Sequence, residues 1–135
     1  MTYRSSCHAN NRTMYEKHRI GSEGEDLAMD YLREHGYTIV ERNWRRGGHM
    51  ELDIVAEQGG TLHFIEVKTR SSESWQSPEA AITPQKVRAL VRAVNNYVTH
   101  NNVECEVTLD LVAIENNPDG THTVRFIPDI ANLSW

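Results

Sequence analysis

The residues best suited to chemistry lie on two apolar stretches joined by a glycine pair. Residues 52–56 and 62–67 are apolar and rich in β-branched side chains. Gly59 and Gly60, between them, supply the positive φ angles of a two-residue hairpin turn. The sequence therefore predicts an antiparallel hairpin.

This turn decides which side chains face each other across the hairpin. Counting outward from the glycine pair, Asp53 lies opposite Glu66, and Glu51 lies opposite Lys68. Directly opposed residues of an antiparallel pair share one face, with Cβ atoms about 5 Å apart. We therefore expect three carboxylates and one amine in one patch at the open end of the hairpin.

Two carboxylates held face to face repel each other, which costs stability unless a cation lies between them. Asp53 and Glu66 in this arrangement indicate a divalent-metal site, because Mg²⁺ takes one or two protein carboxylates and keeps positions for water and phosphate oxygens. Lys68 would orient a water nucleophile or stabilise charge that develops on a phosphate. The alternative is an exposed hairpin face, with Glu51 and Lys68 as an ordinary cross-strand ion pair.

The residues before the hairpin predict a helix that carries a further acid. Ser22 and Glu25 have the spacing of a capping box, and the helix would run to His35 with Gly36 as its terminator. On a helical wheel Glu25 lies at the edge of the apolar stripe. Its carboxylate is either a cap alone or a group aimed over the sheet toward Asp53.

The remaining segments complete a mixed sheet. We expect a strand over residues 37–44, a loop over 69–82, and a helix over about 84–99 with Thr83 as N-cap and Pro84 at its first position. Strands over 106–115 and 122–127 flank a turn with typical turn residues. The order is α-β-β-β-α-β-β, an α/β (α+β) fold with one helix before the hairpin and one after it.

Length and composition are those of one globular domain. The 135 residues are 39% hydrophobic, and we assign residues 20–135 to one domain after a flexible N-terminal arm over residues 1–19. The polar first residues and the short apolar runs predict neither a signal peptide nor a membrane span. Cys7 and Cys105 form no CxxC motif and are expected as free thiols, which favours a cytoplasmic protein.

Charge is spread unevenly along the chain. The net charge of −5 argues against a generally basic coat for nucleic acid. Residues 42–92, however, hold eight bases and six acids, three of which are the hairpin carboxylates. A basic surround of an acidic pocket suits a phosphodiester substrate. Lys86 and Arg88, off the apolar stripe of their helix, are either solvated or phosphate contacts.

These features together resemble a known family. The matching stretches are GSEGEDLAMDYLREHGYTIVERNWR, ELDIVA, LHFIEVKTR, the helix with Lys86, and LDLVAI, which cover roughly residues 21–115. The pattern resembles the restriction-endonuclease-like superfamily and, more closely, the bacterial YraN-like family of uncharacterised proteins, which is related to archaeal Holliday-junction resolvases.

The resemblance implies a restriction-endonuclease-like mixed sheet flanked by helices. It also implies a catalytic quartet and a set of metal ligands. The quartet consists of Glu25, Asp53, Glu66 and Lys68, and the metal ligands are Asp53, Glu66 and the accessory acid Glu51. Met50 stands where the family usually has glycine, which leaves open that His49 joins Glu51 and Asp53 around a softer metal than Mg²⁺.

The leading hypothesis is a Mg²⁺- or Mn²⁺-dependent endonuclease that acts on DNA, branched or junction DNA included. The residues expected to contact nucleic acid are Arg42, Arg45, Arg46, Arg70, Lys86 and Arg88. The alternative is a nucleic-acid-binding module that keeps the nuclease fold without catalysis. The overall acidity and the lack of evident aromatic platforms for base stacking favour weak or narrowly targeted binding. The assembly is left open, with a homodimer as one alternative.

Overall fold

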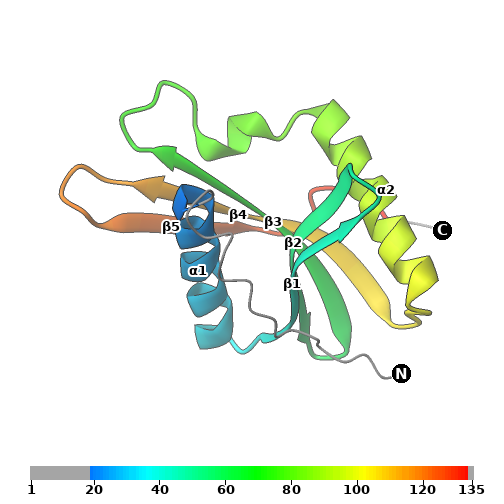
Figure 1. Cartoon of the computed structure of the whole chain (residues 1–135). Helices are drawn as coiled ribbons and strands as arrows, with labels where there is room; N and C mark the ends of the chain where they lie inside the picture. Colours follow the sequence, from blue (N-terminus) through cyan, green and yellow to red (C-terminus); the bar gives the residue numbers. More distant parts are fainter. Residues whose placement is uncertain (1–18, 134–135) are drawn as a thin grey trace.

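The structure, a computed structural model, describes residues 19–133. Within this range the chain forms helices and strands in the expected order, α-β-β-β-α-β-β, with a short 3₁₀ helix (η2) before the second α-helix (Figure 1). The elements are α1 (Arg19–Glu34), β1 (Thr38–Arg46), β2 (Met50–Gln58), β3 (Thr61–Ser71), η2 (Pro78–Ala81), α2 (Pro84–His100), β4 (Glu106–Asn116) and β5 (His122–Ile127). The predicted arm, except for Arg19, and Cys7 within it lie outside the described residues.

The strands form one mixed sheet in the order β1-β2-β3-β4-β5. β3 and β4 run parallel, and the other neighbouring pairs run antiparallel. Parallel neighbours need a long crossover, which the segment through η2 and α2 provides. The chain leaves the sheet for this crossover at the carboxyl end of β3, a kind of position where open α/β sheets bind ligands. This mixed α/β architecture is compatible with the restriction-endonuclease-like fold.

The β2–β3 hairpin has the register that its glycine pair predicts. Gln58 pairs with Thr61, and the pairing continues without a shift to Ile54 and Ile65. Both turn glycines have positive φ, +59° and +84°, as a two-residue turn of this type requires. Every side chain of the paired part of this hairpin therefore points to the face that the sequence assigned to it.

The two α-helices cover opposite faces of the sheet. Leu62 and Phe64 of β3 pack in the cluster that contains the buried residues of α2. Ile65 and Val67 pack in the cluster that contains those of α1. Because successive strand residues alternate between faces, the α1 and α2 clusters lie on different sides. Neither helix within residues 19–133 has the length and apolarity needed to cross a membrane.

The helix ends agree with the sequence at three of four places. Gly36, with φ +89°, follows α1, and the Tyr37 amide donates to the Leu32 carbonyl at 2.9 Å, as in a Schellman motif. α2 ends at His100, within one residue of its predicted end, and it begins at Pro84 after its Thr83 cap.

The start of α1, the end of β1 and the loop after β3 differ from the prediction. β1 ends at Arg46, two residues beyond its predicted end. α1 begins at Arg19, so Ser22 lies inside the helix and is not its N-cap residue. Serine is tolerated inside helices, and capping patterns therefore locate a helix start only approximately. The expected loop over residues 69–82 is also partly ordered, because β3 continues to Ser71 and η2 occupies residues 78–81. The pairing of β3 with β4 continues to Ser71 and Asn116, which explains the longer strand.

Candidate active site

A hollow of about 290 Å³ opens beside the carboxyl half of β3. α1, β2, β3 and the first turn of α2 contribute to its wall. The lining residues are Glu25, Glu51, Asp53, Glu66, Val67, Lys68, Thr69, Arg70 and Lys86. The structure therefore brings all four members of the predicted quartet to one hollow, which we call the carboxylate hollow.

The position of Asp53 follows from where the β2–β3 ladder stops. The last paired residues are Ile54 and Ile65, and one further step would pair Asp53 with Glu66. Instead, the Val67 amide donates to Asp53 Oδ2 at 2.9 Å. A carboxylate thus replaces a backbone carbonyl as the acceptor, so the ladder can end here without leaving this amide unpaired.

Asp53 and Glu66 are neighbours, as predicted, and each carboxyl group shifts the pKa of the other. The Glu66 side chain is only 6% exposed. Its burial, and then the charge of Asp53, raise the pKa of Glu66 to about 7. Burial also raises the pKa of Asp53, against the opposing effect of the Val67 amide. The pair therefore holds a proton near neutral pH, because burial and mutual repulsion disfavour the state in which both carboxyl groups are ionised.

Two lysines lie close to this pair. Lys86 Nζ lies 3.5 Å from Glu66 Oε2, and Lys68 lines the same hollow. Both ammonium groups lower the pKa of Glu66, Lys86 more than Lys68, but burial and Asp53 outweigh them. The Lys86 amide donates to Thr83 Oγ1 at 3.1 Å, which fixes the helical turn from which the Lys86 side chain extends.

Glu25 reaches the hollow from α1. Arg42 on β1 donates through Nε to Glu25 Oε1 at 3.2 Å, and its Nη1 lies 2.8 Å from Asp26 Oδ1. Burial, followed by the charge of Asp53, raises the pKa of Glu25 to about 7. The hypothesis that Glu25 is only a cap is wrong, because the helix begins at Arg19 and the carboxylate lies near Asp53.

α1 can pack this closely on the site because residue 24 is glycine. Gly24 is buried, and a Cβ at this position would collide with Oγ1 of Thr69, one of the lining residues. Glycine inside a helix costs about 1 kcal/mol relative to alanine, so its presence needs a packing reason. The sequence analysis did not identify this packing contact. A glycine inside an otherwise good helical pattern could have indicated it.

Glu51 lines the hollow but forms its ion pair on the side of β1. Its Oε1 lies 3.4 Å from Arg45 Nη2, and the two residues are opposed in the β1–β2 ladder. This ion pair differs from the one with Lys68 that the exposed-face alternative expected. His49 lines a separate hollow of about 190 Å³ at the β1–β2 turn, together with Arg46.

The residues predicted to contact nucleic acid are distributed over several places. Lys86 and Arg70 line the carboxylate hollow, whereas Arg45 and Arg46 border the hollow at the β1–β2 turn. Arg88 is exposed on α2, and the β1 arginine that holds Glu25 is engaged with the acids of α1. Contact of these side chains with nucleic acid remains a prediction.

The donor set of the carboxylate hollow fits a hard divalent cation. Asp53 and Glu66 are adjacent carboxyl groups with raised pKa values, so their ionised forms lack sufficient positive charge nearby. Mg²⁺ is commonly held by one or two protein carboxylates, with water and substrate oxygens at its other positions. In the part of the chain that the structure describes, no three side chains of His, Cys, Asp or Glu form a metal-binding group. Glu51 and His49 as additional ligands remain predictions.

One aromatic residue beyond the end of β3 was missed by the sequence analysis. Trp75 lies between β3 and η2 and is 91% exposed. The expected lack of aromatic platforms did not take this exposed indole into account. The sequence could have indicated this exposure, because Trp75 lies in a serine-rich segment without the apolar periodicity that predicts burial.

Comparison with known proteins identifies similar sequences that cover the whole hollow. The profile of the uncharacterised protein family UPF0102 matches residues 24–114, which include all lining residues. UPF0102 protein BF0634 of Bacteroides fragilis is 45% identical over 101 residues, 75% of this chain and 83% of the relative.

Two further relatives show the same extent of similarity. A UPF0102 protein of Christiangramia forsetii is 42% identical over 108 residues, 80% of this chain and 90% of the relative. A UPF0102 protein of Chlorobium chlorochromatii is 41% identical over 120 residues, 86% of this chain and 91% of the relative. These matches agree with the YraN-like resemblance.

Proposed function

The chain belongs to the UPF0102 family, and from the geometry of its carboxylate hollow we propose that it is a metal-dependent endonuclease that hydrolyses phosphodiester bonds in DNA. The observation that carries this proposal is the meeting of Glu25, Asp53, Glu66 and Lys68 on one hollow. The buried Glu66 and the half-buried Asp53 are neighbours whose ionised forms a cation would stabilise, and a lysine beside them is suited to the charge of a phosphate. The family resemblance favours branched or junction DNA as the substrate, and the free thiols expected from the sequence favour the cytoplasm.

A divalent cation held by Asp53 and Glu66 would supply Lewis-acid chemistry at the phosphate and lower the pKa of a bound water. Lys68 offers up to three hydrogen bonds, with which it would position the attacking water or stabilise the developing negative charge. Glu25, whose pKa is about 7, is suited to accept a proton near neutral pH. Arg70 and Lys86 on the wall would contact phosphates next to the reacting one.

Cleavage of a panel of DNA substrates tests this proposal. Labelled duplex, single-stranded, flap and four-way DNA would be incubated with the full chain and Mg²⁺, Mn²⁺ or EDTA. We expect metal-dependent cleavage by the wild type and none by Asp53→Asn. Asp30→Asn is the matched control, because Asp30 is exposed on α1 outside the hollow, and it should cleave like the wild type. Equal cleavage by Asp53→Asn, or no metal-dependent cleavage of any substrate, would refute the proposal.

A binding module without catalysis is the second candidate function. The Lys86–Glu66 ion pair favours it, because a lysine already supplies one positive charge to the carboxylate pair. In that case EDTA would leave nucleic-acid binding unchanged, and Lys68→Ala would lower affinity no differently from a surface change such as Arg88→Ala. The same substrate panel, read by gel shift as well as by cleavage, separates the two functions.

A further inference from the structure

Trp75 differs from every other large hydrophobic side chain whose burial the structure describes. It is 91% exposed, whereas the others are buried or half-buried. Burial of an indole gives one of the largest gains in stabilising free energy that a single side chain can provide, yet Trp75 remains exposed. Tryptophan is also the residue type most enriched where proteins concentrate binding energy. Trp75 is therefore a candidate contact residue.

The turn that holds Trp75 is well ordered by local hydrogen bonds. The Ser74 amide donates to the Ser71 carbonyl at 3.0 Å. Ser71 Oγ accepts from the Glu73 amide at 3.1 Å, and Ser74 Oγ accepts from the Gln76 amide at 3.2 Å. These serine turns satisfy the backbone without help from the indole, so the exposed position of Trp75 is built into the segment.

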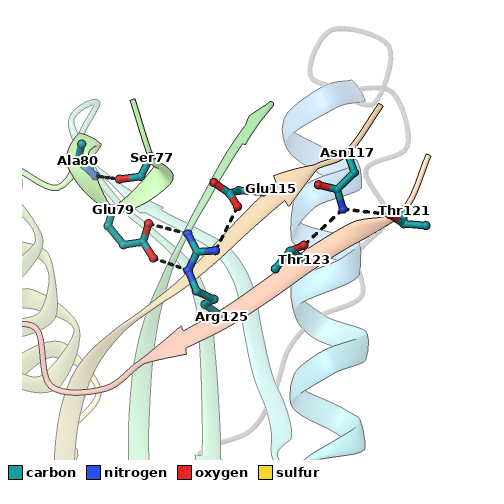
Figure 2. Close-up of polar contacts among 8 residues, drawn as sticks. All are labelled: Ser77, Glu79, Ala80, Glu115, Asn117, Thr121, Thr123 and Arg125. Atoms are coloured by element: carbon teal, nitrogen blue, oxygen red, sulfur yellow. Dashed lines mark hydrogen bonds and ion pairs between the residues drawn. The ribbon is translucent and has the colours of Figure 1, made fainter. Parts of the chain in front are cut away.

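The segment over residues 72–79, which contains Trp75, is attached to the sheet at its C-terminal end. Hydrogen bonds from Arg125, which we call the arginine clamp, make this attachment (Figure 2). Arg125 on β5 donates two hydrogen bonds to the Glu79 carboxylate of η2, at 2.7 and 2.8 Å, and a third to Glu115 on β4 at 3.2 Å. Ser77 caps η2 by accepting from the Ala80 amide at 3.2 Å. A bidentate arginine–carboxylate pair fixes orientation as well as distance. The segment is thus held by β3 at one end and by the clamp at the other.

The segment lies between two groups of residues that line the carboxylate hollow. Thr69 and Arg70 precede it on β3, and Lys86 follows it on α2. In Figure 1 the chain runs past the end of the sheet after β3 and returns through η2 to α2. Trp75 lies five positions after Arg70, so their Cα atoms are at most about 18 Å apart. This distance corresponds to about five nucleotides of a stacked strand, at 3.4 Å for each nucleotide.

We propose that Trp75 is a stacking platform for an unpaired base of a nucleic acid whose backbone lies in the carboxylate hollow, an inference that rests on the proposed function. An indole stacks on the face of any base without reading its sequence. The exposed Glu73 in the same segment would repel phosphates, so the contact is with a base and not with the backbone. Bases inside an intact duplex are already stacked on their neighbours. The substrate class therefore narrows to nucleic acids with single-stranded or unpaired positions close to the cleaved bond.

Tryptophan fluorescence and fluorescence anisotropy test this inference in EDTA, where cleavage cannot interfere. The full chain would be titrated with labelled oligo-dT and with a blunt duplex of equal length. Trp75→Ala should weaken oligo-dT binding by about 5- to 100-fold, the usual effect of removing one aromatic platform. It should also abolish the quenching of emission by oligo-dT and change duplex binding little. Trp75→Phe should retain most of the affinity, and the matched control Gln76→Ala, an exposed neighbour in the same turn, should bind like the wild type.

Three results would overturn the inference. They are unchanged oligo-dT affinity in Trp75→Ala, an equal loss of affinity for the duplex, and a loss of self-association in sedimentation velocity without a loss of DNA binding. The last result would assign Trp75 to a protein contact. If binding depends on Trp75 but no metal-dependent cleavage occurs, only the proposed function is refuted. If cleavage and binding both occur and neither changes when Trp75 is replaced, only this inference is refuted.

Discussion

Replacing Glu66 by glutamine should stabilise the protein at pH 8 and leave its stability almost unchanged at pH 4.5. The pKa of Glu66 is raised from 4.5 to about 7 in the folded chain. A raised pKa means that the folded state binds the proton more tightly, so this stabilising contribution is complete below pH 4.5 and is lost as the pH rises through 7. At 1.36 kcal/mol for each pKa unit, the loss above pH 7 is about 3 kcal/mol. Glutamine imitates the protonated carboxyl at every pH and avoids this loss.

Thermal unfolding in EDTA, measured from pH 4.5 to 8, checks this expectation. A gain of about 3 kcal/mol corresponds to a rise in melting temperature of roughly 10 °C at pH 8 for a domain of this size. The difference between Glu66→Gln and the wild type should shrink steadily as the pH falls. A shift of the same size at both ends of this range would refute the view that burial and Asp53 strain the Glu66 carboxylate.

Glu79→Gln is the matched control because the same substitution should have the opposite sign. The hydrogen bonds from Arg125 hold the pKa of Glu79 below its usual range. A lowered pKa gives stability that is present above the usual pKa and is lost as the pH falls. Glu79→Gln should therefore destabilise the protein at pH 8, with the difference shrinking toward low pH.

Three further changes probe separate parts of the site. Lys68→Ala should leave Mn²⁺ affinity nearly intact and lower single-turnover cleavage by about 10²–10³-fold, the usual effect of losing one transition-state donor; a change in DNA affinity alone would contradict this role. Lys86→Met removes a cation 3.5 Å from Glu66, which raises the pKa of that carboxyl further. Mn²⁺ binding measured by calorimetry should then weaken at pH 6 and match or exceed that of the wild type at pH 9, whereas equal weakening at both would contradict the electrostatic account. Gly24→Leu adds bulk where even a Cβ meets Thr69, and urea unfolding should show a loss of about 1–3 kcal/mol; unchanged stability would mean that α1 can retreat from β3 freely.

The central hairpin could be predicted because its turn allows few alternatives. Two consecutive glycines with positive φ define a two-residue connection, and such a connection fixes the register of the strands beside it. Counting residues outward from the turn was therefore enough to predict that Asp53 and Glu66 are neighbours. The Thr83-Pro84 start of α2 was predictable for a similar reason, since both residues act on the backbone next to them.

Contacts between distant segments could not be predicted in the same way. The Arg42–Glu25 hydrogen bond, the approach of Gly24 to Thr69 and the reach of Lys86 to Glu66 depend on how the helices dock on the sheet. Hydrophobic periodicity indicates which face of a helix is buried but not its position along the strands.

The packing of the core and the end of the β2–β3 ladder also could not be predicted from local sequence patterns. Tyr97 of α2 is buried against Trp44 and Phe64, a contact that the sequence analysis did not predict. The ladder also ends before Asp53 because a side chain, and not the next backbone carbonyl, accepts from Val67. No local pattern encodes that exchange.

Calorimetric titration of Mn²⁺ into the full chain tests most directly the central claim that Asp53 and Glu66 bind a divalent cation. It would be run at pH 6.5 and pH 8.5, in buffers with different heats of ionisation. Because the carboxyl pair holds a proton near neutral pH, the wild type should bind Mn²⁺ and release about one proton for each cation at pH 6.5, and fewer at pH 8.5. Asp53→Asn should lose this binding, while Asp30→Asn retains it. Absence of binding in the wild type, or identical titration curves for Asp53→Asn and the wild type, would contradict the claim.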